Sequence, residues 1–229
     1  RYPESKYIQR EIDNYQKIDH PFIPKFFGRV KESDYYIIEF INGKTLSNIK
    51  NLHFNNNEKI TIIFELMIVI EYLHRNHFIY RDLKLNNIMI DENKTVVLID
   101  FDKMIDYKST ISDREMTNDF SSLYVAPEVN SNNFSYECDI YSLGKIIYFI
   151  IAEMDPTFQN IKTLNIPKDY SKIEQIIKKC VNENAKERPS ISEVIIEFYV
   201  LCHTQILIDD IFERFESYFI KLFDKNLID

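Results

Sequence analysis

The first forty residues change from a helical to a strand-like hydrophobic pattern. Apolar residues recur every three or four positions from Ile8 to Ile18, which predicts an amphipathic helix that ends before His20-Pro21. Two apolar runs follow at residues 26–30 and 35–41, with a short polar turn between them. This arrangement predicts an antiparallel hairpin.

The next eighty residues carry one long apolar helix pattern and a second hairpin pattern. Asn42-Gly43 predicts a turn into a short helix that ends near residues 55–57. Apolar residues fill most of the circumference of a helix over Glu58 to Asn76, which predicts a helix buried inside the domain. Short apolar runs at 88–90 and 96–99 flank a polar turn and predict the hairpin.

The second half of the chain is predicted to be helical after a polar loop. Residues 102–122 are rich in Ser, Thr and Asp and are typical of a functional loop. Helical patterns follow at 139–152, 171–181 and 190–202, and an amphipathic stripe runs from Ile208 to Phe223.

Composition narrows the classes of function. The chain has 229 residues, 45% of them hydrophobic, and a net charge of −8, so nucleic acid is not an expected partner. No apolar stretch reaches the roughly 20 residues of a membrane span, and no signal peptide is expected at the start. Three widely spaced cysteines lack metal or disulfide spacing, which favours a reducing compartment, the cytoplasm.

Two polar segments carry the candidate chemistry. Residues 80–87 lie between the buried helix and the second hairpin, and residues 98–102 follow that hairpin. Taken one at a time, their carboxylates could be solvated turn residues. Their order in the chain could instead bring an aspartate, a lysine, an asparagine and a second aspartate to one phosphate and metal site. These are Asp82, Lys84, Asn87 and Asp100.

In this pattern the chain resembles the catalytic core of a protein kinase. Further motifs at family spacing support the resemblance over most of residues 4–198. Ala126-Pro127-Glu128 resembles the end of an activation segment, and Glu128 would pair with Arg188. Asp139 resembles the aspartate that holds the backbone of the catalytic loop. The implied fold is α+β, two-lobed and kinase-like, with a mostly helical large lobe and a partial small lobe.

The resemblance implies a role for each residue of the candidate site. Asp82 would accept and orient the proton of the substrate hydroxyl, and Lys84 would offset charge on the transferred phosphoryl group. Asn87 and Asp100 would bind magnesium, and Asp100 would link the metal to the phosphates of ATP. The implied function is transfer of the ATP γ-phosphoryl group to serine or threonine hydroxyls of a protein substrate.

Other positions are implied by the resemblance alone. Adenine would contact residues at the hinge and on the following sheet, namely Glu39, Phe40, Ile41 and Met89. Structural or regulatory roles would belong to Glu11, Arg81, Phe101, Glu128, Asp139 and Arg188. Arg81 could pair with a phosphate on an activation-segment hydroxyl, for which the candidates are Ser109, Thr110, Ser112 and Thr117.

The resemblance also divides the chain. Residues 1–41 would form part of the small lobe, residues 42–201 the large lobe, and residues 202–229 an amphipathic helical extension. That extension could dock a partner, although packing on the domain itself is the more common fate. His74 and His77, near the end of the buried helix, are expected near the helix dipole or at the surface rather than at a metal site.

Two departures from the family pattern leave alternatives open. The ten residues before Glu11 hold neither a glycine-rich phosphate loop nor a strand lysine, and Arg1 in place of Met favours a truncated chain. Asp102 stands where the family has glycine, which could weaken nucleotide binding or bias the conformation of the segment. A pseudokinase that acts as a scaffold or regulator, or an inactive fragment, is therefore the alternative.

Overall fold

The computed structural model describes residues 4–31, 33, 35–51, 54–108, 123–131 and 134–205. The helices are α1 Glu4–Tyr15, α2 Asn56–Arg75, α3 Tyr136–Ala152, α4 Phe158–Thr163, α5 Ile173–Cys180 and α6 Ile191–Gln205. The strands are β1 Phe26–Arg29, β2 Tyr36–Ile38, β3 Gly43–Thr45, β4 Phe78–Ile79, β5 Ile88–Asp91, β6 Val96–Leu98 and β7 Ile105–Asp106. The four candidate phosphorylation sites and the stripe at 208–223 lie outside the described residues.

Helix α2 is the centre of the large helical part, as its all-round apolar pattern predicts. Its N-terminus is closed by a capping box in which Asn55 and Glu58 satisfy each other's backbone N–H groups. Residues on every side of the helix are buried, as the four consecutive buried positions Met67, Ile68, Val69 and Ile70 show. A helix buried on all sides must be covered by other elements, and α2 contacts α3, α6, β4 and β6.

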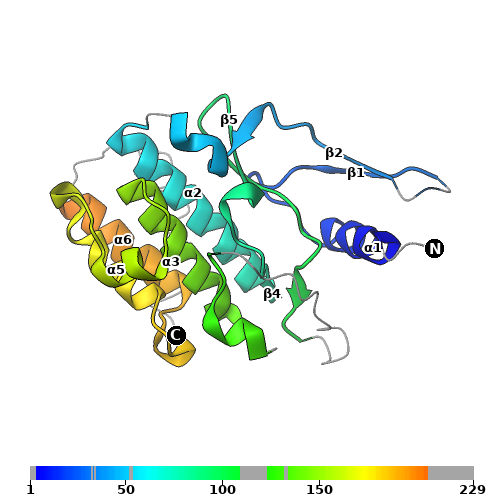
Figure 1. Ribbon diagram of the computed structural model, residues 1–229. Helices are drawn as coiled ribbons and strands as arrows, with labels where there is room; N and C mark the ends of the chain where they lie inside the picture. The colour runs from blue at the N-terminus through cyan, green and yellow to red at the C-terminus, as the bar shows by residue number, and fades with distance from the viewer. Residues whose placement is uncertain are drawn as a thin grey trace, which may run out of the picture.

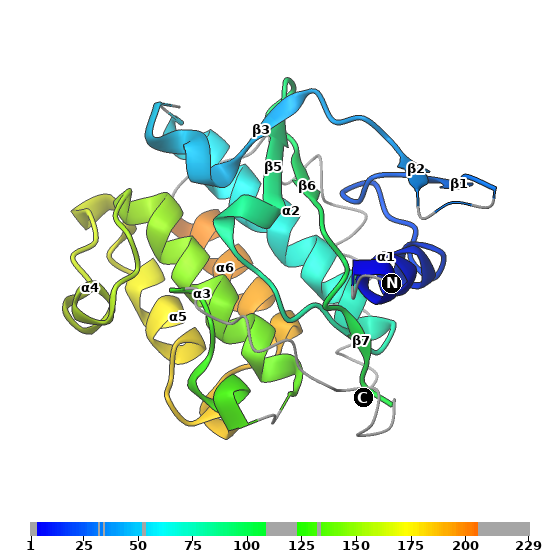
Figure 2. The ribbon, with the colours of Figure 1, turned by 45° about the vertical axis from the view of Figure 1, so that its right-hand side comes forward.

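Helices α3, α5 and α6 complete the helical part around α2. Helix α3 packs on α2 and α5, and α6 packs on α2 and α5, so the four helices share one core (Figure 1). Phe64 of α2 and Phe198 of α6 meet edge to face with ring centroids 4.9 Å apart. Figure 2 shows α4 at the margin of this group, beside the end of α3.

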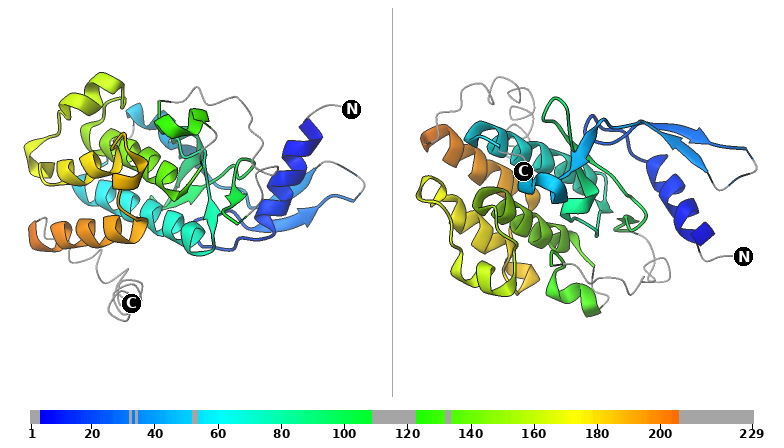
Figure 3. Two further views of the ribbon diagram at one scale, coloured as in Figure 1. Left: turned by 90° about the horizontal axis from the view of Figure 1, so that it is seen from below. Right: turned by 45° about the horizontal axis from the view of Figure 1, so that its top comes forward.

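The N-terminal part lies on the other side of the strands from the helical part. Figure 3 shows α1 and the β1–β2 hairpin set apart from α3, α5 and α6. The segment after α1 joins the two parts, because Leu98 N–H donates to the Phe22 carbonyl at 2.9 Å and Asp19 N–H donates to the Tyr72 hydroxyl at 2.8 Å. These contacts fix the N-terminal part against β6 and α2.

The middle sheet differs from the prediction at Asn42-Gly43. A short helix was expected directly after this turn, but Gly43 begins strand β3, and the helix is a 3-10 turn at Leu46–Asn51. Strand β3 pairs with β5, and β5 pairs with β6, both antiparallel. A β-carbon on Gly43 would lie 2.3 Å from the Ile90 carbonyl oxygen, so the glycine permits this close pairing.

The remaining predicted elements are present, with shifts at their ends. Helix α1 ends at Tyr15 although the apolar period continues to Ile18, which is buried in the following segment. Helix α3 begins at Tyr136, three residues before the expected start, and α6 continues to Gln205. The pattern did not predict α4, which buries no residue, or the two-residue pairing of β4 with β7.

None of the helices in the described ranges is both long enough and apolar enough to cross a membrane.

We expect Gly43→Ala to lower the free energy of unfolding by about 1–3 kcal/mol, because the added methyl group must push β3 away from β5. Denaturant unfolding of the protein measures the change. Lys44→Ala, at the exposed neighbouring position, is the control and should change stability by less than about 0.5 kcal/mol. Equal effects of the two substitutions would contradict the close approach at Gly43.

Candidate active site

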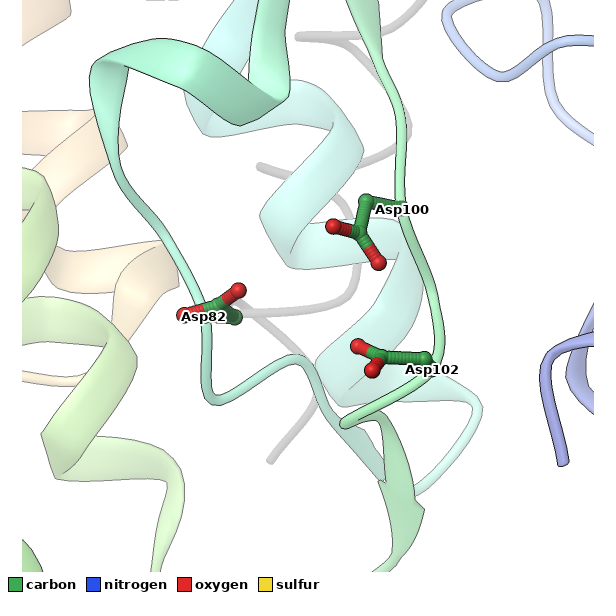
Figure 4. A group of neighbouring side chains, drawn as sticks. All are labelled: Asp82, Asp100 and Asp102. Atoms are coloured by element: carbon green, nitrogen blue, oxygen red, sulfur yellow. The ribbon is translucent and has the colours of Figure 1, made fainter. Parts of the chain in front are cut away.

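The two polar segments singled out in the sequence meet in space. One, at residues 80–87, connects β4 to β5, and the other, at residues 99–104, connects β6 to β7. The β5–β6 hairpin between them brings their ends together, and Ile99 N–H donates to the Asn87 carbonyl at 2.9 Å. Figure 4 shows the carboxylates of Asp100 and Asp102 pointing from one segment toward the loop that carries Asp82.

Asp82 is held by three polar side chains. Its carboxylate is 6% exposed, and Oδ2 accepts hydrogen bonds from Lys84 Nζ at 2.7 Å and from Asn87 Nδ2 at 3.0 Å. Lys103 Nζ donates to Oδ1 at 3.2 Å. Two ammonium groups and one amide thus face one buried carboxylate and fix its orientation.

Asn87 is oriented by its hydrogen bonds. Its Nδ2 donates both to the Asp82 side chain and to the Asp82 carbonyl, each at 3.0 Å. This commits the amide nitrogen to the loop and makes Oδ1 the atom that can face a cation. Together with the carboxylate of Asp100, the site presents the oxygen donors that a hard divalent cation such as Mg²⁺ prefers, so the residues fit the metal that the sequence implied.

Three carboxylates converge at this point. Asp82, Asp100 and Asp102 each place an oxygen so that the three atoms lie within 4.8 Å of one another. Burial raises the pKa of the Asp102 carboxyl to about 7, and the adjacent Asp100 adds to the effect. Lys84 and Lys103 also reach this cluster, through their ion pairs with Asp82.

The backbone conformation at Asp102 is one that residues other than glycine adopt readily. The φ angle of Asp102 is not in the left-handed region, whereas Asp100 has a φ of 65°. The backbone at position 102 therefore does not require glycine in this conformation.

Asp139, at the start of α3, anchors the loop that carries Asp82. Its carboxylate is 1% exposed and accepts hydrogen bonds from the backbone N–H groups of Tyr80 and Arg81, both at 2.8 Å. Arg81 has a φ of 72°, a conformation costly for a residue with a side chain. The two hydrogen bonds to a charged group offset that strain.

His74 lies in the last turn of α2, as the helix-dipole alternative predicted, and its side chain is buried rather than at the surface. The side chain is 8% exposed, and Nε2 lies 2.9 Å from Oδ2 of Asp139. The sequence did not predict this partner, which lies sixty-five residues away along the chain. His77 is exposed, as expected.

Phe101 connects the active-site segment to both parts of the fold. It is fully buried and meets Tyr80 and Tyr15 edge to face, with ring centroids 5.4 and 5.2 Å apart. Tyr15 in turn stacks on Phe26 of β1 at 6.1 Å. This row of four rings, here called the aromatic column, runs from the catalytic loop through α1 to β1.

Asn14 of α1 holds the same segment through its backbone. Its Nδ2 donates to the carbonyls of Phe101 at 2.6 Å and Met104 at 3.0 Å, and the side chain is 5% exposed. Sequence reasoning missed Asn14, although its position three residues after Glu11 places both on one face of α1.

Glu11, on α1, lies near Asp100, and its carboxylate is hydrogen-bonded to Tyr36 and to the backbone of Phe101. The Tyr36 hydroxyl and the Phe101 backbone N–H donate hydrogen bonds to its carboxylate. Burial raises the pKa of Glu11, the nearby Asp100 carboxylate raises it further, and these two hydrogen bonds oppose the rise. Tyr36 therefore provides a polar contact to Glu11 that the sequence did not reveal.

The ion pair predicted between Glu128 and Arg188 is present. Arg188 donates from Nη1 and Nη2 to the two carboxylate oxygens of Glu128 at 2.6 and 2.9 Å, and its side chain is fully buried. This two-pronged pairing fixes the segment after the polar loop against α3. Nearby, the Arg81 guanidinium lies 3.9 Å from the centre of the Phe134 ring.

The residues expected to contact adenine lie on the connection between the two parts. Glu39, Phe40 and Ile41 follow β2 and lead to β3, and Met89 lies on β5 beside Thr45 of β3. Glu39 N–H donates to the Lys25 carbonyl at 2.8 Å, so this backbone donor serves the hairpin. The side chain of Phe40 is 86% exposed.

We expect Asp139→Ala to lower the free energy of unfolding by about 2–5 kcal/mol, because two buried N–H groups lose their acceptor. Denaturant unfolding measures the loss. Glu137→Ala removes a partly exposed carboxylate from the same helical turn and is the matched control, with an expected loss below about 1 kcal/mol. If both variants lost the same amount, Asp139 would not be the anchor of the loop.

Comparisons with known proteins agree with the resemblance. A family model described as protein kinase domain matches residues 2–214. The chain is 32% identical over 174 residues to a probable serine/threonine-protein kinase PLK of Dictyostelium discoideum, a match that covers 73% of this chain and 17% of that protein. It is 26% identical over 218 residues to an Aurora kinase of Debaryomyces hansenii, with 87% of this chain and 52% of that protein covered. The chain thus spans about a sixth to a half of the length of these two relatives.

Proposed function

Because this chain belongs to the protein kinase family, we propose that it transfers the γ-phosphoryl group of ATP to serine or threonine hydroxyls of proteins. The observation that carries the proposal is the convergence of Asp82, Lys84, Asn87 and Asp100 from two segments that a hairpin separates. Family membership supplies the fold, and this cluster supplies the chemistry.

In the proposed reaction, Asp82 orients the substrate hydroxyl and accepts its proton as the oxygen attacks phosphorus. Its buried position and fixed orientation suit this role, because a base held in place avoids reorganisation during the reaction. Lys84 lies at hydrogen-bond distance from Asp82 and is partly exposed, so it can also reach a phosphoryl oxygen beside the base.

Asn87 Oδ1 and the carboxylate of Asp100 would hold Mg²⁺, and the bound ion would offset negative charge on the phosphates of ATP. The hinge at residues 39–41 and Met89 would bind the adenine end of the nucleotide. Serine or threonine is the proposed acceptor because Lys84 follows Asp82 by two residues and because the similar proteins are named serine/threonine kinases.

We expect Asp82→Asn to reduce the rate of phosphoryl transfer by about 10²–10⁴-fold, since the amide keeps the shape of the side chain but cannot accept the proton. The measurement is incorporation of radiolabelled γ-phosphate from Mg²⁺-ATP into a general acceptor protein. The exposed Asp13 of α1 gives a matched control, and Asp13→Asn should retain the full rate.

Wild-type protein that binds Mg²⁺-ATP without transferring phosphate, or that fails to bind it, would contradict the proposal. The failure to bind would favour the alternative of a pseudokinase, for which Asp102 in place of glycine is the specific observation. Equal transfer rates for the wild type and Asp82→Asn would remove Asp82 from the reaction.

A further inference from the structure

We propose that Asp102 is a second carboxylate ligand, beside Asp100, at the divalent-cation site and that it allows the protein to bind the cation in the absence of nucleotide. The inference rests on the proposed function for the identity of the site, and it adds a ligand to Asn87 and Asp100. With this ligand, coordination of the cation would not depend on the phosphates of the nucleotide.

The first observation is an oxygen without a partner. Oδ1 of Asp102 is inaccessible to solvent and accepts no hydrogen bond from any residue in the described part of the chain. A buried carboxylate oxygen that has lost its water and gained no donor is costly, and native proteins rarely leave one in that state. A cation bound at this oxygen would remove the cost.

The second observation is the position of that side chain. The carboxylate of Asp102 points from the segment after β6 toward Asp82, on the same side as the carboxylate of Asp100 (Figure 4). Oxygens of all three residues lie within 4.8 Å of one another. Mg²⁺ has bonds of about 2.0–2.1 Å and opposite ligands about 4.0–4.2 Å apart, so one ion can bridge this group after the oxygens approach one another by up to about 0.8 Å.

The distribution of charge directs the cation to Asp100 and Asp102. Lys84 and Lys103 both donate to Asp82, at 2.7 and 3.2 Å, so Asp82 is the carboxylate whose charge the lysines balance most directly. Asp100 and Asp102 lie two residues apart on the opposite segment, and their carboxylate oxygens lie within 4.8 Å of each other. A divalent ion between them would offset the charge of both carboxylates.

A purely structural role for Asp102 does not account for these observations. Its backbone conformation does not require a special residue, and its Oδ1 caps no backbone N–H group among the described residues.

The test is binding of Mn²⁺, used as the probe, to the nucleotide-free protein. The free Mn²⁺ signal in electron paramagnetic resonance gives the dissociation constant. We expect the wild type to bind one Mn²⁺, and Asp102→Asn and Asp102→Gly to weaken that binding about tenfold or more. Asp13→Asn removes an exposed carboxylate of the same charge and should leave the dissociation constant unchanged.

Thermal unfolding without metal shows whether each variant is folded, and the shift of the melting temperature on adding Mn²⁺ gives a second readout of binding. The inference is overturned if the wild type and both Asp102 variants bind Mn²⁺ equally, or if the wild type binds none without nucleotide. Phosphoryl transfer is measured separately. Mn²⁺ binding that depends on Asp102 in a protein without transfer activity would reject the proposed function alone, whereas unchanged Mn²⁺ binding in an active protein would reject this inference alone.

Discussion

The carboxylate of Asp139 accepts hydrogen bonds from two consecutive backbone N–H groups, those of Tyr80 and Arg81, in the interior of the protein. The geometry of the site depends on this interaction. Arg81 adopts a left-handed conformation that a side chain disfavours, and the next residue is Asp82. Because Asp139 belongs to α3, which packs on α2 and α5, the core of the helical part determines where Asp82 lies. His74 adds a contact from α2, so two helices hold one loop.

The second constraint joins the two parts of the fold. The aromatic column passes from the loop that carries Asp82 through Phe101 to α1 and β1, and it consists of large apolar rings in contact. Phe101 lies in the middle of this column and directly follows Asp100. The position of a proposed metal ligand is thereby linked to packing between the helical part and the N-terminal part, although the ligand itself is polar and partly exposed.

The sequence predicted the elements with strong periodicity, above all the buried helix α2, and it predicted which two segments meet. It did so because motifs at fixed spacing carry information about distant contacts that periodicity does not carry. The contacts of Lys103 with Asp82 and of His74 with Asp139 were not predicted. In each pair the partners lie far apart along the chain, and neither spacing nor propensity indicates such a contact. Strand β3 was not predicted because Asn42-Gly43 is a common turn sequence. In the structure, Gly43 instead allows β3 to lie close to the backbone of Ile90.

Asn14 links the position of α1 to the position of the segment after β6. Its amide bonds two carbonyls of the segment after β6, Phe101 and Met104, while the neighbouring Tyr15 packs on the Phe101 ring. An outward rotation of α1 must break both buried hydrogen bonds or carry the segment with it. The position of α1 and the position of the segment that carries Asp100 are therefore coupled, and a displacement of the helix changes the surroundings of Asp100.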